Sequence, residues 1–188
     1  AGRTIAGTGN DHTVKLWDNG SGELLRSWTV PGTTIRAVAM DRRGAQVGAA
    51  CADGSVHIWS TASGELLAVI KAHPRQATGL ALGQRDGQQL LLTISPGKTA
   101  CVWDLGTGKM LVELQSHEAS ITAGSFAPDG GRIVTASTDR TARIWSTADG
   151  TCLHVLAGHG HVVADAVFSP DGGLVATASW DETARIWQ

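Results

Sequence analysis

The chain lacks several features that would point to a particular class of protein. It contains no tyrosine, two phenylalanines and only three cysteines, Cys51, Cys101 and Cys152, among its 188 residues. The cysteines are odd in number, widely spaced and form no C-x-x-C pair. This pattern disfavours a disulfide framework and a zinc site, and it favours a reducing, cytoplasmic location.

The chain also has no strong excess of one charge and no long hydrophobic run. The 15 Lys and Arg residues nearly balance the 17 Asp and Glu residues, and no run of like charge occurs. Nucleic acid and anionic membrane surfaces are therefore not expected as partners. No apolar run approaches the roughly 20 residues that cross a bilayer. With 42% hydrophobic residues, the chain is expected to form a globular, soluble protein with a sizeable core.

Tryptophan, by contrast, recurs at a nearly constant spacing. Trp17, Trp59, Trp103, Trp145 and Trp187 are separated by 42, 44, 42 and 42 residues, within the roughly 40–45-residue period of a propeller blade. Each lies in a string that alternates small or polar with apolar residues, such as TARIWS at 141–146. Because this alternation is flanked by Asp-Gly turns, it predicts short antiparallel strands, four to a repeat, in an all-β fold.

These repeats resemble the WD40 family, whose units run from a Gly-His pair to a Trp-Asp pair. The last repeat shows the pattern most clearly, from Gly158-His159 to the string TARIWQ at 183–188. The resemblance implies a β-propeller of four-stranded antiparallel blades, with strands a to d running from the central channel outward. About five blades are expected here, the first without strand a and the last without strand d, as part of a seven-bladed ring. Residues 1–188 then form one partial propeller, with repeats spanning 1–18, 19–60, 61–104, 105–146 and 147–188.

The resemblance also implies a buried hydrogen-bonded tetrad of His, Ser or Thr, Asp and Trp in each blade. The last two repeats match every position, with His117, Ser137, Asp139 and Trp145, and then His159, Ser179, Asp181 and Trp187. The third repeat has His73, Ser95 and Trp103, but Gly97 replaces the Asp. The second keeps Asp53 and Trp59 with Pro31 and Cys51 at the other positions, and the first keeps Asp11 and Trp17 with Gly9 at the hydroxyl position. We therefore expect weaker local order in the first three repeats.

Two catalytic or metal-binding alternatives deserve comparison with this structural role. A Ser, His and Asp in one network could form a hydrolase triad, but the set recurs in two repeats and has no G-x-S-x-G pattern beside it. His154, His159 and His161 could hold a metal ion, but His159 already belongs to the tetrad. The sequence therefore predicts no enzyme activity, no metal and no cofactor.

Partner binding is expected on the face that carries the loops between strands d and a and between strands b and c. The family's recurrent contact positions lie three and five residues after the tetrad His and just before the tetrad Asp. Transferred here, they are Asn10, Thr34, Arg36, Ala52, Gln76, Thr78, Pro96, Ser120, Thr122, Thr138, Val162, Ala164 and Trp180. The selected candidates are Trp180, Arg36, Gln76, Asn10, Thr78 and Thr138, with Trp180 and Arg36 as anchors because Trp and Arg often dominate binding energy. Alternatively, Trp180 could fold over the adjacent blade, and Arg36 could pair with an acidic residue across the channel.

The function implied by the resemblance is that of a non-catalytic scaffold for protein–protein interaction. Two alternatives stay open. The chain could be a structural segment of a large intracellular assembly, for instance a cytoskeletal or ciliary one, or the propeller could carry a ligand or catalytic site at the channel mouth. The channel-facing loops are dominated by Thr, Ser, Gln, Gly and Ala, which favours binding over chemistry.

Overall fold

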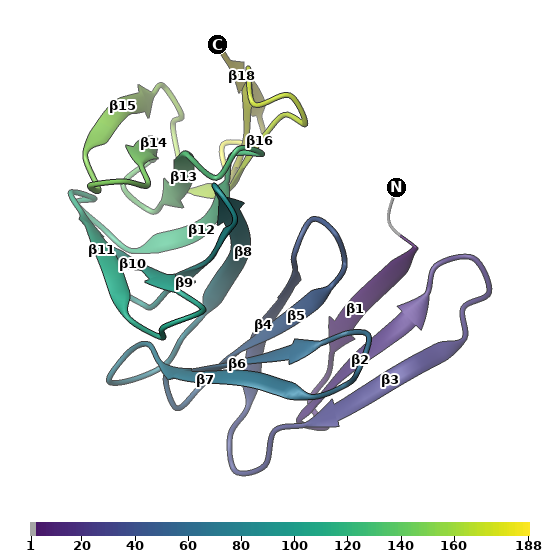
Figure 1. The fold of residues 1–188 in the computed structure, drawn as a ribbon. Coiled ribbons are helices and arrows are strands. Elements are labelled where there is room, and N and C mark those ends of the chain that lie inside the picture. Colours follow the sequence, from purple (N-terminus) through teal and green to yellow (C-terminus); the bar gives the residue numbers. More distant parts are fainter. Residues whose placement is uncertain (1–2) are drawn as a thin grey trace. The chain divides into compact units, whose positions relative to one another are not determined.

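The computed structural model describes residues 3–188, which form strands and turns and contain no helix (Figure 1). The chain divides into two compact units, the first ending at Leu82 and the second running from Gly83 to Gln188. Within residues 3–188, 18 strands form five sheets, and each sheet is a meander in which every strand lies beside the next one along the chain. We call these sheets blades 1 to 5 in chain order.

Three blades have four strands and the two terminal ones have three, as the resemblance to the WD40 family implied. Blade 1 consists of β1 (Thr4–Thr8), β2 (Thr13–Asp18) and β3 (Leu24–Thr29). Blade 2 consists of β4 (Ile35–Met40), β5 (Gln46–Cys51), β6 (Ser55–Ser60) and β7 (Leu66–Lys71). Blade 3 consists of β8 (Gly79–Arg85), β9 (Gln88–Ile94), β10 (Thr99–Asp104) and β11 (Met110–Gln115). Blade 4 consists of β12 (Ile121–Phe126), β13 (Arg132–Ser137), β14 (Thr141–Ser146) and β15 (Cys152–Ala157). Blade 5 consists of β16 (Val163–Phe168), β17 (Val175–Ser179) and β18 (Ala184–Trp187).

Burial follows the position of each strand in its blade. The second strand of every four-stranded blade is buried on both faces over most of its length, as the apolar runs of β5, β9 and β13 require. The outermost strands β7 and β11 share one pattern in which most residues are exposed. The inner strands therefore hold the core, and the outer strand of each blade forms its edge.

The same irregularity precedes the repeated tryptophan in each of the first four blades. The register between the third and fourth strands of the repeat shifts immediately before Trp17, Trp59, Trp103 and Trp145. A bulge bends a strand and redirects its side chains. The recurring tryptophan thus occupies an equivalent place in each of these blades.

The longer third repeat is accommodated by a longer hairpin. Here β8 and β9 have seven residues each, and Asp86 and Gly87 alone connect them with φ values of 51° and 83°. Positive φ at both central residues is the requirement of the two-residue turn that matches strand twist, and Asp-Gly satisfies it. The extra residues lengthen the strands and leave the turn short.

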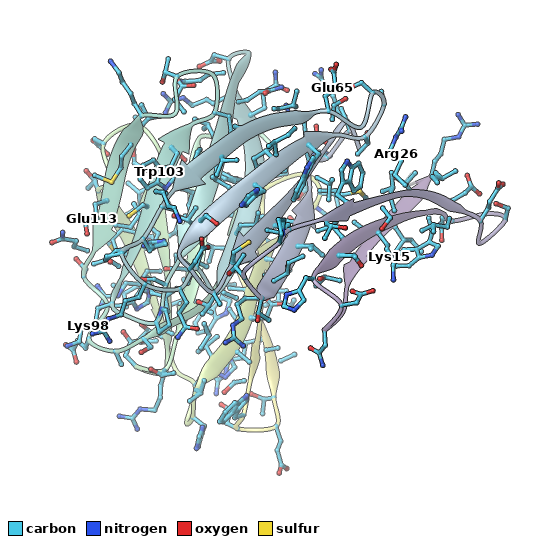
Figure 2. All side chains as sticks on the ribbon, turned by 90° about the horizontal axis from the view of Figure 1, so that it is seen from below. Lys15, Arg26, Glu65, Lys98, Trp103 and Glu113 are labelled. Atoms are coloured by element: carbon cyan, nitrogen blue, oxygen red, sulfur yellow. The ribbon has the colours of Figure 1, made fainter. Side chains whose placement is uncertain are left out.

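Each unit has its own hydrophobic core. In the first unit, Trp28 of β3 is buried and stacks on Trp59 of β6, with ring centroids 5.8 Å apart. The Trp28 indole also donates a hydrogen bond to the Gly64 carbonyl, at 2.8 Å. Arg26 of β3 reaches the same β6–β7 turn and donates to the carbonyls of Thr61 and Ala62; Arg26 is labelled in Figure 2. Blades 1 and 2 are therefore joined by apolar packing and by hydrogen bonds.

One hydrophobic cluster of the second unit lies between blades 4 and 5. It consists of small and β-branched side chains, namely Val134, Ala136, Ala142, Ile144, Val163, Ala166 and Val175. Thr122 of β12 also donates a hydrogen bond to the Val163 carbonyl, at 2.6 Å. The strand-a ends of these two blades are thereby held side by side.

Candidate interaction site

Blades 4 and 5 each contain a buried polar network that connects two loops. In blade 4, His117 lies between Asp139 and Thr135, with its Nδ1 2.7 Å from the Asp139 carboxylate and its Nε2 2.7 Å from the Thr135 hydroxyl. The Trp145 indole donates to the same hydroxyl at 2.8 Å. Blade 5 repeats this arrangement with His159, Asp181, Thr177 and Trp187, at distances of 2.8 to 2.9 Å.

The donors and acceptors of this network fix the direction of its hydrogen bonds. The ionised Asp139 carboxylate can only accept, so Nδ1 of His117 carries the proton and donates to it. In the neutral ring Nε2 then accepts, so the Thr135 hydroxyl donates to Nε2 and accepts from the Trp145 indole, which can only donate. With the imidazole neutral, every polar side-chain group of this four-residue network has a hydrogen-bond partner.

Asp139 also binds the backbone of both loops. One carboxylate oxygen accepts from the backbone N–H and hydroxyl of Thr141, at 2.9 and 2.6 Å. The other accepts from the backbone N–H of Glu118, at 3.1 Å, in addition to His117. The turn between β13 and β14 is thereby tied to the segment that precedes β12. The network is thus a device for positioning loops.

The pKa values follow from this geometry. Burial lowers the pKa of His117 below its usual 6.5, although the neighbouring Asp139 acts in the opposite direction. Burial opposes ionisation of Asp139, but the hydrogen bonds from Thr141 and His117 outweigh it and lower the pKa of Asp139 to about 2. The stable state at neutral pH is therefore a neutral imidazole beside an ionised carboxylate.

The structure corrects one member of each predicted tetrad. The hydroxyls in the two networks belong to Thr135 and Thr177, two residues before the predicted Ser137 and Ser179. Trp145 lies opposite Ile133 in the β13–β14 ladder, so Thr135 is about 7 Å along the strand and Ser137 about 13 Å. Only the threonine is within reach of the indole.

The two serines serve the loops directly. Ser137 donates to the Ala119 carbonyl at 3.3 Å and accepts from the backbone N–H of Asp139 at 3.1 Å. Ser179 makes the equivalent bonds to the His161 carbonyl and the Asp181 N–H. The serines therefore hydrogen-bond the same two loops as the aspartates, but they are not members of the networks.

Blades 1 and 2 hold the equivalent aspartates by lysine. Lys15 approaches Asp11 to 2.6 Å and Lys71 approaches Asp53 to 2.8 Å. The lysine hydrogen bonds are the main cause of the low pKa of these carboxyl groups, which is about 2 for Asp11. Lys15 is labelled in Figure 2. Sequence comparison missed both lysines because neither occupies the His position of the repeat.

The network positions of these blades are filled by smaller groups. Gly7 and Ala49 stand where blades 4 and 5 have Thr135 and Thr177. A Cβ atom at Gly7 would lie 3.1 Å from the Trp17 ring, so glycine leaves room for that indole. In blade 2, the Trp59 ring stacks on His57 with centroids 5.7 Å apart. In blade 2, aromatic packing of Trp59 thus replaces the hydrogen bonds that the tryptophan makes in blades 4 and 5.

Blade 3 is intermediate between the two arrangements. The Trp103 indole, labelled in Figure 2, donates to the Thr93 hydroxyl at 2.9 Å. Gly97 has no side chain with which to bind the loops. Thr93 again precedes the predicted Ser95 by two residues, so the tryptophan and threonine half of the network recurs in three blades.

None of these networks has the arrangement of a nucleophile and its base in a substrate site. Thr135 is fully buried, and its hydroxyl is already engaged by Trp145 and His117. In blade 2, the Ser55 hydroxyl donates to Asp53 at 2.6 Å and faces Nε2 of His57 at 3.2 Å. The serine there lies between the acid and the imidazole, whereas a catalytic triad has the imidazole in the middle. In the described part of the chain, no group of three or more His, Cys, Asp or Glu side chains is arranged to hold a metal ion.

The predicted partner-binding residues fall in both units. Asn10, Arg36 and Thr138 are exposed, and Gln76 and Thr78 are half-buried. In the second unit, Thr138 donates through both its backbone N–H and its hydroxyl to the Ser120 carbonyl, at 2.9 and 3.2 Å. The equivalent backbone bond in blade 5 joins Trp180 to Val162 at 2.9 Å. We call the surface made by these turns of blades 4 and 5 the loop end of the second unit.

Trp180 is the most exposed large hydrophobic residue among those described. Its side chain is 67% exposed, and its ring stacks on His161 with centroids 5.8 Å apart. Nδ1 of His161 accepts the backbone N–H of Val162, at 2.8 Å. The tryptophan is therefore supported from one side by an oriented imidazole of its own blade, and much of its surface faces solvent.

The repeated sheets and their shared network define the class of protein as one built from β-propeller blades. The family model described as "WD domain, G-beta repeat" matches residues 22–60, 108–146 and 150–188. The chain therefore belongs to the WD40 repeat family. Residues 3–188 contain no helix long and apolar enough to span a membrane.

Several curated proteins are similar to this chain. Nuclear distribution protein PAC1 of Arthroderma otae is 31% identical over 138 residues, which is 68% of this chain and 30% of that protein. Autophagy-related protein 16 of Arabidopsis thaliana is 22% identical over 172 residues, or 70% of this chain and 34% of that protein. Pre-mRNA-processing factor 19 of Bos taurus is 29% identical over 126 residues, or 65% and 24%. The matched part of this chain thus spans about a third or less of each relative's length.

Proposed function

We propose that this chain is a non-catalytic scaffold that binds protein partners, with Trp180 and Arg36 as the main contact residues. Trp180 lies in a turn positioned by the blade 5 tetrad, and Arg36 lies in β4 of the first unit. The observation that carries the proposal is the exposed indole of Trp180, which is supported by His161. Its neighbouring turn is fixed by the Asp181 carboxylate, which accepts from Thr183, His159 and the Gly160 backbone. A rigid, exposed aromatic side chain loses little conformational freedom on binding, which favours affinity.

The family supports a mode of action and not a particular partner. The names of the three relatives refer to nuclear distribution, autophagy and pre-mRNA processing, which are three different processes. WD40 repeats recur in all of them as the matched part. A scaffold role is the property that such proteins can share, and the partner of this chain has to be found by experiment.

An intracellular location is part of the proposal. Cys51, Cys101 and Cys152 all carry free thiols, and the first two are buried. Burial raises the pKa of Cys101 to about 11 and also raises that of Cys51, so these thiols are protonated and unreactive at neutral pH. Free cysteines of this kind are compatible with a reducing compartment.

The test is to compare the affinity of single variants for a partner identified by affinity capture. Trp180→Ala and Arg36→Ala are each expected to weaken binding by about 2 kcal/mol or more if they are anchors. Matched controls are Leu111→Ala on the outer strand β11 and Arg43→Ala in the β4–β5 turn, both exposed residues outside the predicted contact positions. Unchanged affinity in both anchor variants, with folding intact, would refute this choice of surface.

A further inference from the structure

The surroundings of Trp180 indicate the chemistry of a side chain that would bind there. Trp180 lies in the turn between β17 and β18, directly before Asp181 and Glu182. The Asp181 carboxylate is engaged by His159, Gly160 and Thr183. Glu182 is exposed and lies in the same turn as Trp180, with its backbone N–H bonded to the Ser179 carbonyl at 3.2 Å. An open indole is thus placed in the same turn as the exposed Glu182 carboxylate.

The aromatic pair is ordered before any partner arrives. Ser179 and Trp180 are hydrogen-bonded to the carbonyls of His161 and Val162, at 3.2 and 2.9 Å. His161 in turn stacks on the Trp180 ring with an interplanar angle of 26°. One face of the indole is therefore backed by the imidazole, and the opposite face is available to a ligand.

We propose that the exposed face of Trp180 binds an arginine side chain of the partner protein, with Glu182 supplying the complementary charge. The inference rests on the proposed function and names the partner chemistry at the same site. The negative face of an indole attracts a cation. A planar guanidinium can stack on the ring while its edge donates to a carboxylate, which a compact ammonium cannot do equally well. An aliphatic side chain would gain from the ring alone and would leave the Glu182 carboxylate unused.

A peptide titration tests this inference without knowledge of the native partner. The probes are acetyl-Gly-Gly-Arg-Gly-Gly-amide and the same peptide with citrulline, which has nearly the shape of arginine and no charge. The readout is the indole N–H resonance of Trp180 in ¹⁵N-labelled chain, assigned by its absence in Trp180→Phe. We expect the arginine peptide to shift this resonance in a saturable way, and the citrulline peptide to do so much less at equal concentration.

Two carboxylate variants locate the charge contribution. Glu182→Gln is expected to weaken the arginine peptide by about two- to fivefold, the range of an exposed cation–π or ion-pair contact. Glu118→Gln is the control, since Glu118 is an exposed carboxylate in the segment before β12, beside a turn that has Thr138 in the place of Trp180. A smaller change in the control supports the inference. Equal changes in both variants would show only general electrostatic attraction and would overturn it.

The outcomes also separate this inference from the proposed function. If Trp180→Ala weakens a captured partner but the arginine and citrulline peptides bind alike, the scaffold surface stands and the arginine proposal fails. If the arginine peptide binds selectively but Trp180→Ala leaves the captured partner unaffected, the arginine site stands and the scaffold proposal fails at this residue.

Discussion

Blades 2 and 4 hold the same turn aspartate with different partners. In blade 4, the Asp139 side chain is 7% exposed and is held by His117 from a preceding loop. In blade 2, the Asp53 side chain is 42% exposed and is held by Lys71 at the end of β7. A buried carboxylate requires specific hydrogen bonds, whereas an exposed one is also solvated by water. The complete network therefore connects two loops, and the lysine version braces a turn within its own blade.

The turn that follows this aspartate is also packed differently in the two blades. The residue after the aspartate has positive φ in both, 83° at Gly54 and 72° at Arg140. In blade 2, the His73–Arg75 backbone passes over Gly54, and the backbone N–H groups of Ala72 and His73 donate to the Gly54 carbonyl. Blade 4 accommodates an arginine side chain at the corresponding position. The turn of blade 2 thus depends on the absence of a side chain.

The largest predicted loss of stability tests this difference in packing over the turn. Gly54→Ala would place a Cβ atom 2.1 Å from the His73 carbonyl oxygen and 2.0 Å from that of Arg75. Because backbone must move and the φ value is unfavourable for alanine, we expect a loss of about 2–3 kcal/mol in the free energy of unfolding. Arg140→Ala is the matched control and should change it little. Urea denaturation followed by circular dichroism measures both, and equal stability of the two variants would contradict the packing described.

The second prediction compares the two aspartates directly. Asp139→Ala leaves the partly buried donors of His117 and Thr141 and the backbone N–H of Glu118 without this acceptor, so we expect a loss of about 1–3 kcal/mol. Asp53→Ala breaks an exposed lysine pair and the Ser55 contact, so its loss should be below about 1 kcal/mol. Denaturant midpoints of the two variants provide the comparison. Equal losses would show that histidine and lysine are equivalent partners in this fold.

A third prediction separates the two hydroxyls of β13. Thr135→Val preserves shape but leaves the Trp145 indole without an acceptor and His117 without a donor, which should cost about 1–2 kcal/mol. Ser137→Ala removes a longer bond to the Ala119 carbonyl and should cost about 0.5–1 kcal/mol. The same denaturation experiment ranks them, with Thr177→Val and Ser179→Ala as a second pair in blade 5. A larger loss for the serine variants than for the threonine variants would indicate that the serines are the hydroxyl members of the network.

The hydroxyl assignment shows where sequence reasoning reached its limit. The tryptophan spacing and the alternation correctly predicted repeats of short strands, because a period of about 42 residues and strict alternation are properties of single segments. The blades and their incomplete terminal sheets were implied by the resemblance to the WD40 family. Thr135 and Ser137 are two residues apart and lie on the same face of β13, so alternation cannot distinguish them. The choice depends on the register with β14, which places Trp145 opposite Ile133.

The lysine partners could not be predicted for a related reason. Lys71 belongs to β7 and lies opposite Ser55 in the ladder with β6, 18 residues from Asp53 in the chain. Its long side chain reaches the turn from a position where other repeats have Gln115 and Ala157. Comparison of repeats detects a missing histidine at a fixed offset, but it does not detect a compensating charge that arrives from another strand. The pairing of Asp53 with Lys71 in blade 2 therefore depends on the fold and not on the repeat pattern.

The smallest predicted effect concerns pH and distinguishes histidine from lysine as a partner. Burial lowers the pKa of His117, so below pH 6.5 the unfolded chain binds more protons at this residue than the folded chain does. Its contribution to stability is therefore fully present above pH 6.5 and declines as the pH falls below that value. In His117→Gln the titrating group is absent, and the stability difference between the wild type and this variant should narrow between pH 7 and pH 5.

Asp53 stays ionised throughout this range because its lysine contact lowers its pKa, so Asp53→Asn should leave the pH dependence unchanged. Urea midpoints at pH 7, 6 and 5 measure the effect, and a constant difference for His117→Gln would show that the buried imidazole is not the group that titrates.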